Sequence, residues 1–443
     1  MKIQLSDHFD YQRLLRYTIP SIIMMILTSI YSIVDGLFVS NFVGKIPFAS
    51  LNLMYPFIMA ISTIGFMLGT GGSAVVGIAL GEGKKEKANQ YFSMIIYIVG
   101  ITGIIISIIA IIFMKDIAYL LGASDQMIEY CTIYGRIIAA GLTAFILQVA
   151  FQSFSVVAQK PTLSLKLSIA SGLTNVVLDY IFVVVLKWGI SGAAFATIIG
   201  QVVGAVVPLI YFYRENDSLL QLTKTKLYGK ILLKVCTNGL SELMTNISSS
   251  IVNILYNFQL MSLAGENGIA AYGVIMYAAF IFSAIYIGYS IGSAPIVSYH
   301  YGATNDNELK NLMRKSLIIT AIAGLMMTIL AELLAPILVK FFVGYDQELF
   351  IMICHGFRLY AISFIIMGFN IWSSGFFTAL GDGITSAILA FLRTLAFQVI
   401  IILILPIILG LNGVWLAIVI AELLALMVTI YFLYKKKDKY HYI

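Results

Sequence analysis

The chain has 443 residues, of which 60% are hydrophobic and only 11% are charged, and its net charge is +6. Soluble domains average about 45–50% apolar and about 25% charged residues, so this composition excludes an ordinary soluble protein and indicates a polytopic membrane protein. The three cysteines and four histidines lie far apart and follow no zinc or disulfide spacing, which argues against a metal centre and against a disulfide framework.

Long apolar segments follow one another along the chain, each at least as long as the roughly 20 residues that a membrane-spanning helix needs. We predict twelve spans, at 14–40, 48–79, 91–113, 130–158, 163–186, 190–213, 229–262, 268–298, 316–340, 351–379, 385–408 and 412–434. The connections between them are short, and none is long enough to hold a soluble catalytic domain. The sequence therefore predicts an all-α membrane protein with twelve transmembrane helices.

Lysine and arginine collect in alternate connections and after the last span. They gather in the segments 84–87, 160–166, 214–234, 310–315 and 435–439, whereas the opposite connections hold single lysines. Because cytoplasmic loops carry an excess of Lys and Arg, we expect a multi-pass protein of the cell membrane with both termini in the cytoplasm. The positive charge is thereby explained by topology, with no nucleic-acid partner.

The two halves of the chain resemble each other. "GGSA" at 71–74 resembles "IGSA" at 291–294, and "WGISGAAFA" at 188–196 resembles "LGLNGVWLA" at 409–417. The second copies lie 220 and 221 residues after the first, a distance that we call the repeat offset. Six spans fill each repeat, so both repeats have the same orientation and are related by a pseudo-two-fold axis along the membrane normal. We predict an N-terminal six-helix lobe over residues 1–220 and a C-terminal one over 221–443, an organisation in which transporters often bind substrate between the halves.

Four polar side chains fall at one depth of the N-terminal half: Asp35 in the first span, Asn175 and Asp179 one turn apart in the fifth, and Thr197 in the sixth. At a rise of about 1.5 Å per residue, they lie roughly 10–12 Å below the outer end. A carboxylate at that depth costs at least about 2.5 kcal/mol, which indicates function. Two carboxylates, an amide and a hydroxyl suit a hard cation or a shared proton, so Na⁺ and H⁺ are alternatives. The competing interpretation is a hydrogen-bond network that only joins the three spans.

The repeat provides an internal control for this cluster. The repeat offset leads from the four positions to Tyr256, Ala396, Ile400 and Ile418, which form no comparable cluster. A group needed only to pack six helices would tend to persist in both halves. The asymmetry therefore favours a function confined to the N-terminal half.

Three further residues are candidates. Pro20 lies inside the first span, where it is either a bending point or a static kink. Tyr134, near the outer start of the fourth span, falls at or just above the depth of the four polar side chains. Glu242 begins the seventh span on its cytoplasmic side. Three alternative roles are predicted for it: attraction of a cationic substrate, pairing with Lys234, or a place at the membrane interface.

Other features are weaker. Arg393 in the eleventh span is expected to pair with Glu332 or Glu422. The glycine-rich segment "GEGKKEKA" at 81–88 lacks the spacing of a phosphate-binding loop, and no strand precedes it. We therefore expect no ATP-binding site, and an ion gradient is the energy source that remains.

The chain resembles the MATE family of multidrug and toxic-compound extruders in the order and spacing of several segments: "YSIVDGLFVSNFVG", "GTGGSAVVGIALGEG", "TNVVLDYIF", "GISGAAFATIIGQ" and "YHYGA". The resemblance covers essentially the whole chain. It implies a V-shaped pair of helix bundles that exports amphipathic, often cationic compounds, driven by entry of Na⁺ or H⁺.

The resemblance also implies roles for individual residues. The cation site of prokaryotic members uses a span-one Asp, a span-five Asn-x-x-x-Asp and a span-six Thr, and these match Asp35, Asn175, Asp179 and Thr197. A bending proline matches Pro20, and a span-four tyrosine near the site matches Tyr134. Some relatives have a second acidic site on spans seven and ten. Glu242 fits its first position, but span ten, "GFNIWSSGFFTAL", contains no carboxylate.

From these observations we expect a monomeric multidrug efflux antiporter without a cofactor, with small amphipathic drugs or toxins as substrates. The coupling ion and the physiological substrate stay open. Two alternatives are a flippase for lipid-linked oligosaccharides of the same superfamily and an integral-membrane enzyme. The first often carries more basic residues in its cavity, and the second needs a catalytic constellation, and neither feature is evident in the sequence.

Overall fold

The computed structural model describes residues 3–343 and 347–443. In the first half of the chain the helices are α1 (Tyr11–Phe42), α2 (Lys45–Gly81), α3 (Lys85–Leu120), α4 (Ile128–Val157), α5 (Pro161–Asp179) with the π-helical turn η1 (Tyr180–Val185), and α6 (Gly189–Tyr213). Each of these is long and apolar enough to cross a membrane, α5 together with η1. The first six spans thus lie where the sequence predicts them.

The second half contains α7 (Gly229–Gly302), α8 (Asp306–Val343), α9 (Gln347–Ala361), α10 (Phe364–Ala379), α11 (Gly383–Phe391), η2 (Leu392–Ala396), α12 (Phe397–Leu409), α13 (Leu411–Lys435) and α14 (Lys437–Tyr440). α7 consists of two spans joined at Gly265, whose φ of 59° and ψ of −148° interrupt the helix. α9 and α10 form one span bent by 49°, and α11, η2 and α12 form another. The predicted twelve-span, all-helical architecture is confirmed for the described residues.

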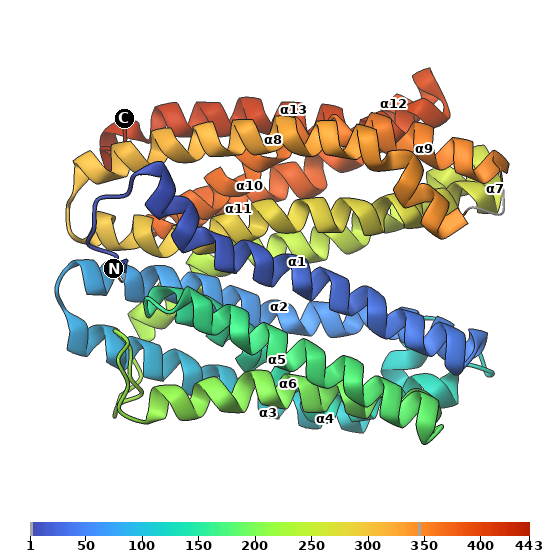
Figure 1. Ribbon diagram of the computed structural model, residues 1–443, viewed down its shortest axis with the longest axis horizontal. Coiled ribbons are helices and arrows are strands. Elements are labelled where there is room, and N and C mark those ends of the chain that lie inside the picture. Colours follow the sequence, from blue (N-terminus) through green and yellow to red (C-terminus); the bar gives the residue numbers. More distant parts are fainter. Residues whose placement is uncertain (1–2, 344–346) are drawn as a thin grey trace.

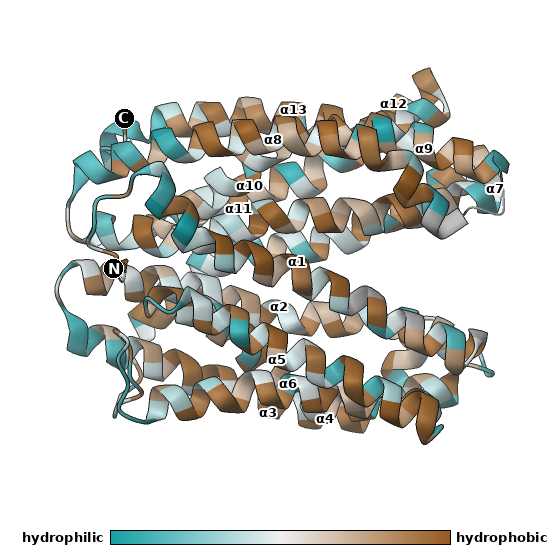
Figure 2. Cartoon of the chain, viewed as in Figure 1, coloured by the Kyte–Doolittle hydropathy of each residue, from teal (hydrophilic) through white to brown (hydrophobic). Residues whose placement is uncertain are grey.

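The helices form two lobes with apolar middles. Figure 1 shows α2–α6 in one lobe and α8–α13 in the other, with both termini at the same end of the molecule. Apolar residues dominate the length of the helices, and hydrophilic residues gather at their ends and in the connections (Figure 2). This is the distribution of a multi-pass membrane protein. The boundary predicted at residue 220 falls in the connection between α6 and α7.

The lobes meet along a line of glycines on α2 and α7, which we call the glycine seam: Gly71, Gly81, Gly239 and Gly302. A Cβ at Gly71 or Gly81 would lie 2.1 or 2.0 Å from a carbonyl oxygen of α7, and a Cβ at Gly239 or Gly302 would lie 2.0 or 2.1 Å from one of α2. The two backbones are therefore in direct contact, which is how small residues allow membrane helices to approach closely.

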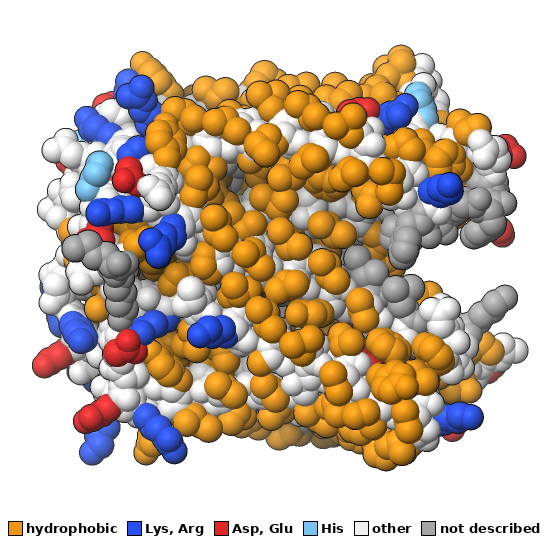
Figure 3. Space-filling view, viewed as in Figure 1, with side chains coloured by type: hydrophobic (Ala, Val, Ile, Leu, Met, Phe, Trp, Pro, Cys, Tyr) orange, Lys and Arg blue, Asp and Glu red, His pale blue; other side chains and the backbone are white. Residues whose placement is uncertain are grey.

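The glycine seam lies toward the end that holds the termini, and the opposite end is open. Figure 3 shows the molecule hollowed between the two lobes at the end away from the termini, and it shows Lys and Arg side chains gathered at the terminal end. On this face of the molecule the hollow therefore lies at the end opposite to the glycine seam.

Replacing Gly81 by Ala tests whether the seam holds the lobes together. The added methyl group meets the Tyr299 carbonyl, so we expect a loss of about 1–3 kcal/mol in stability, as for an overpacked core. The measurement is the thermal unfolding midpoint of the purified protein. Gly100→Ala on α3 is the matched control, because its Cβ would meet nothing within 4 Å. Equal midpoints for the two variants would contradict a tight seam.

Candidate functional site

The structure brings the four predicted polar residues together between α1, α5 and α6. Thr197 Oγ1 lies 3.4 Å from Asp35 Oδ1 and 3.0 Å from the Ala193 carbonyl oxygen, and Asn175 Nδ2 donates to Thr197 Oγ1 over 3.4 Å. The carboxyl groups of Asp35 and Asp179 are close enough to interact with each other. The depth argument from the sequence therefore predicted the correct neighbours.

Asp179 is the least compensated member of this cluster. Its side chain has no exposed surface, and neither of its carboxylate oxygens has a hydrogen-bond partner among the residues that the structure describes. Burying a charge is strongly unfavourable unless a partner or a proton neutralises it. Asp35, Asn175 and Thr197 are only partly buried, so Asp179 is the most buried group of the cluster.

Small residues and a π-turn set this geometry. α5 ends at Asp179, and the wider turn of η1 follows at once; π-turns inside helices are frequent at functional sites. Gly172 of α5 accommodates the ring of Tyr31 from α1, and a Cβ at Gly200 of α6 would lie 3.2 Å from the Cβ of Asn175. The three helices thus approach closely enough for short polar side chains to meet.

Tyr134 of α4 completes the cluster from the other side. It is buried, with 5% of its surface exposed, and its phenol lies close enough to Asp35 and Asp179 for an electrostatic interaction. The same phenol also interacts with Tyr55 of α2, a residue that sequence reasoning missed. Tyr134 thus lies near both the carboxylates and Tyr55, a tyrosine that is 41% exposed.

Pro20 lies where α1 changes its partners. Just around it, a Cβ at Gly292 of α7 would contact Thr18, and one at Gly288 would contact the Ser21 carbonyl. Farther along, α1 packs against α5 and reaches Thr197 of α6. α1 therefore bridges the two lobes, and its proline is buried at the transition.

Glu242 lies on α7, one turn beyond Gly239 of the glycine seam, and its side chain is partly exposed. The ammonium group of Lys234 lies 3.6 Å from the position of a Cβ on Gly381, so it points to the loop before α11. This direction of Lys234 argues against a pairing with Glu242, whereas a substrate contact and a place at the membrane interface stay alternative predictions for Glu242.

The C-terminal lobe contains a buried carboxylate with a built-in partner. Glu422 of α13 is 1% exposed. Arg393 of η2 donates from Nε to Glu422 Oε1 over 2.8 Å, and Asn370 of α10 donates to Oε2 over 2.7 Å. Thr429 Oγ1 donates to Asn370 Oδ1 over 2.9 Å. Of the two partners expected for Arg393, the structure selects Glu422.

Glu332 pairs instead with Arg358, over 3.5 Å. At the position that the repeat assigns to Asp35, the buried Tyr256 shares a hydrogen bond of 3.2 Å with Gln398. The C-terminal counterpart of the cluster is thus a neutral pair, as the internal control predicted. Among the described residues of the N-terminal cluster and of its C-terminal counterpart, the buried carboxylate without an ion pair is Asp179 of the N-terminal lobe.

Comparison with known proteins places the chain. The MatE family model matches residues 20–181 and again residues 243–404. The chain belongs to the MatE family. The starting points of the two matches, residues 20 and 243, are separated by close to the offset of the repeat, so each half contains one copy of the same unit. The helices described above are therefore those of a MATE family transporter.

Individual relatives are distant but cover the full length. The multidrug export protein MepA of Staphylococcus haemolyticus (strain JCSC1435) is 22% identical over 97% of this chain and 94% of its own. Two solved MATE structures, one in an outward-facing and one in a straight conformation, superpose with a TM-score of 0.92 at 24% identity. Both cover 98% of this chain and 97% of theirs. These likenesses confirm the fold.

The Arg393–Glu422 pair gives a stability test. Removing Arg393 leaves Glu422 as an unpaired buried charge, so we expect Arg393→Ala to cost about 3–5 kcal/mol. The exposed Arg358–Glu332 pair is the control, with side chains 51% and 42% exposed, and Arg358→Ala should cost at most about 1 kcal/mol. The measurement is the thermal unfolding midpoint of each variant. Similar losses of stability in the two variants would refute a special role for the buried pair.

Proposed function

We propose that this MATE transporter is a secondary antiporter that exports amphipathic, often cationic compounds in exchange for Na⁺ or H⁺. The observation that carries the proposal is the buried Asp179 carboxylate, which has no ion pair among the described residues and lies beside Asp35. The buried carboxylate of the other lobe, Glu422, has Arg393 as a built-in cation. The N-terminal lobe has no such built-in partner at Asp179, so an exchangeable cation or proton supplies the missing charge.

The donor set fits both ions. The cluster contains two carboxylates, the Thr197 hydroxyl and the Asn175 amide, and oxygen is the ligand that hard cations prefer. The amide now presents its nitrogen to Thr197, and a half-turn of the side chain would present its oxygen. A proton shared between Asp35 and Asp179 relieves the same repulsion. The proposal therefore keeps Na⁺ and H⁺ as alternatives that an experiment separates.

The export of drugs is supported by the cleft and by the relatives. The proteins of similar sequence are named multidrug export proteins, and the partly exposed Glu242 lies one turn beyond Gly239 of the glycine seam, where the two lobes meet. With the basic end in the cytoplasm, the cleft opens to the outside, and the chain functions as a monomer. Glu242 then attracts the cationic part of a substrate, which apolar walls hold by its hydrophobic part.

α1 is the coupling element in this mechanism. Its segment beyond Pro20 contacts the ion cluster, whereas its segment around Pro20 packs on α7. Because proline removes a backbone hydrogen bond, it lowers the cost of bending the helix at that point. Neutralisation of Asp35 and Asp179 changes the packing of the outer segment, and the lobes respond. The ion drives export only to the extent that it prefers one conformation over the other.

Asp35→Asn and Asp179→Asn test the coupling. Each removes one carboxylate but keeps the size of the side chain, so we expect gradient-driven ethidium efflux from everted vesicles to fall at least about tenfold. Asp116→Asn, at an exposed position of α3, is the control and should transport normally. Parallel assays with an imposed Na⁺ gradient and with an imposed pH gradient identify the ion. Normal efflux by both cluster variants would refute coupling through this site.

Glu242→Gln tests substrate recognition separately. The change removes the negative charge next to the glycine seam but keeps hydrogen bonding, so we expect weaker binding of cationic drugs by about three- to tenfold. Uncharged compounds should bind as before. Equilibrium binding to the purified protein measures both. A loss that is equal for charged and uncharged compounds would indicate a structural role for Glu242.

A further inference from the structure

The segments that precede α1 and α7 are both bound firmly to the helices around them, although chain ends are poorly ordered unless something ties them down. We call residues 3–10 strap 1 and residues 219–228 strap 2. Both lie at the end of the molecule that holds the termini (Figure 1). Because α1 and α7 begin the two repeats, the straps occupy equivalent places in the two halves of the chain.

Strap 1 is bound to the C-terminal lobe through the backbone of Phe9. Its N–H donates to Glu308 Oε1 over 2.9 Å, and its carbonyl oxygen accepts from Asn311 Nδ2 over 2.9 Å and from Lys315 Nζ over 2.6 Å. His8 Nδ1 lies 2.6 Å from Glu308 Oε2. The α8 partners all belong to its first three turns. Charged side chains thus hold both backbone groups of one residue, and such bonds are about twice as strong as neutral ones.

The contact of strap 1 is buried and extends to the other lobe. Glu308 is 5% exposed, and Phe9 has no exposed surface. The Phe9 ring meets His300 of α7 edge to face, with ring centroids 6.4 Å apart, and meets Tyr17 of α1 in the same way at 6.1 Å. Tyr17 donates from its phenol to the Val156 carbonyl oxygen of α4 over 2.7 Å. Strap 1 and the start of α1 therefore connect the C-terminal lobe to the N-terminal lobe.

Strap 2 is bound to the N-terminal lobe in a similar way. The Gln221 N–H donates to Asn89 Oδ1 over 3.1 Å, and the Thr223 N–H donates to Ser93 Oγ over 2.8 Å. Both acceptors lie in the first three turns of α3. Because α3 is the third span and α8 is the ninth, the same turns of equivalent helices bind the two straps.

The two binding sites also correspond residue by residue. Gln90 of α3 accepts from the Tyr228 phenol of strap 2, and Asn311 of α8 donates to the Phe9 carbonyl oxygen of strap 1. Gln90 and Asn311 are separated by the repeat offset. The contact between strap and helix is therefore a feature of the repeated unit and occurs once in each lobe.

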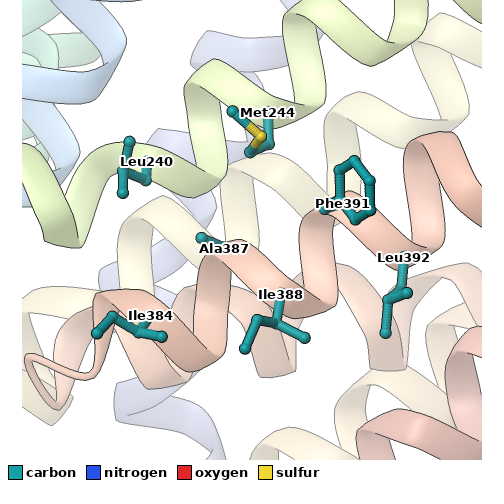
Figure 4. Close-up of a pocket in the computed structure, with 7 residues that line it drawn as sticks. All are labelled: Leu240, Met244, Ile384, Ala387, Ile388, Phe391 and Leu392. Carbon is teal, nitrogen blue, oxygen red and sulfur yellow. The ribbon is translucent and has the colours of Figure 1, made fainter.

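Beyond strap 2, α7 crosses to the C-terminal lobe. Val235 belongs to the apolar core of the N-terminal lobe, and Asn238, one turn later, accepts at Oδ1 from the Gly383 N–H of α11 over 3.2 Å. A Cβ at Gly383 would lie 2.2 Å from the Thr237 carbonyl oxygen, so the backbones of α7 and α11 touch. A groove of about 270 Å³ follows (Figure 4), with apolar walls that include Leu240, Met244, Ile384 and Ile388. The backbone contact thus lies before the groove, at the terminal end of the two helices.

We propose that the two straps form a crossed latch, which keeps the terminal end of the molecule closed and is released when that end opens. Each strap binds one lobe and continues into a helix that contacts the other, so separation of the lobes at this end would stretch both sets of bonds. Transporters built from repeats open alternately at their two ends as one repeat rocks against the other. The latch lies opposite to the hollow of Figure 3 and acts together with the glycine seam. Its action does not depend on which ion is coupled.

The test measures the separation of the lobes by double electron–electron resonance on the purified full-length protein. Spin labels on Lys85→Cys and Asp306→Cys, at the exposed first residues of α3 and α8, report the distance at the terminal end after the three native cysteines are replaced. We expect mainly one short distance without further changes. Glu308→Ala leaves the Phe9 N–H without its charged acceptor, so the ratio of open to closed molecules should rise at least about tenfold.

Further variants make the test specific. Asn89→Ala combined with Ser93→Ala removes two acceptors of strap 2 and should raise the same ratio at least about fivefold. Glu308→Gln keeps an oxygen for the Phe9 N–H but loses the charge, so its effect should be smaller than that of Glu308→Ala and is measured even if the alanine variant does not fold. Glu215→Gln changes an exposed carboxylate at the same end and should leave the distances unchanged. Thermal unfolding midpoints verify that each variant is folded.

Three results would overturn the latch. The first is the unchanged distance distribution in the folded variants of both straps. The second is slowed transport with unchanged distances, which would make the straps static anchors of α1 and α7. The third is an equal change in Glu215→Gln, which would show a general loosening of this end. The efflux assays of the Asp35 and Asp179 variants are separate, because their failure would contradict the proposed coupling while the distances still decide on the latch.

Discussion

The direct backbone contact along the glycine seam is the constraint on which the rest of the structure depends. Because α2 and α7 touch at Gly71, Gly81, Gly239 and Gly302, the lobes are joined near the end that holds both termini. The helices diverge from there, and the divergence creates the cleft. The carboxylate Glu242 lies next to the seam because its neighbour Gly239 is part of it. The position of the cleft thus follows from the positions of the seam glycines, which allow the two helices to touch at one end only.

The two lobes share one backbone plan but treat buried charge differently. In the C-terminal lobe, Glu422 is neutralised by Arg393 and held by Asn370, so its state is fixed by groups of the protein itself. In the N-terminal lobe, Asp179 is buried and its carboxylate oxygens accept no hydrogen bond from the described residues, so in the proposed mechanism an exchangeable cation or proton neutralises it. A duplicated fold can in this way combine a static half with a responsive one. α1 connects them, since it packs on α7 around Pro20 and on α5 beyond it.

Much of this organisation could be predicted from the sequence. Hydropathy located the twelve spans, and helix rise placed Asp35, Asn175, Asp179 and Thr197 in one layer, where the structure joins them. The depth of a residue along a span follows directly from residue counts, which explains why the members of this layer were predicted correctly. The direction in which a side chain points around the helix axis does not follow from residue counts, so the partner of Arg393 stayed undecided between Glu332 and Glu422. The local breaks, Gly265 within α7 and the π-turn after Asp179, result from tertiary packing, which periodicity does not reveal.

Tyr55 was missed for a different reason. The chain contains 26 tyrosines, and tyrosine is common in membrane helices, so composition gives no signal for a particular one. The signal that could have found it is the repeat, because Tyr277 is its counterpart in the second half. Charged residues are conspicuous in an apolar span, whereas aromatic ones acquire meaning only from their counterparts and neighbours.

The central claim is that Asp35 and Asp179 hold an exchangeable ion whose binding opposes drug binding. The most direct measurement is the release of a pre-bound fluorescent organic cation from the purified protein as Na⁺ is added at constant pH, and as pH is lowered without Na⁺. Linkage requires the two ligands to affect each other's affinity equally. We predict that one of the two titrations releases the dye and that Asp179→Asn abolishes the response. A dye affinity that changes in neither titration, with the dye still bound, would contradict the claim.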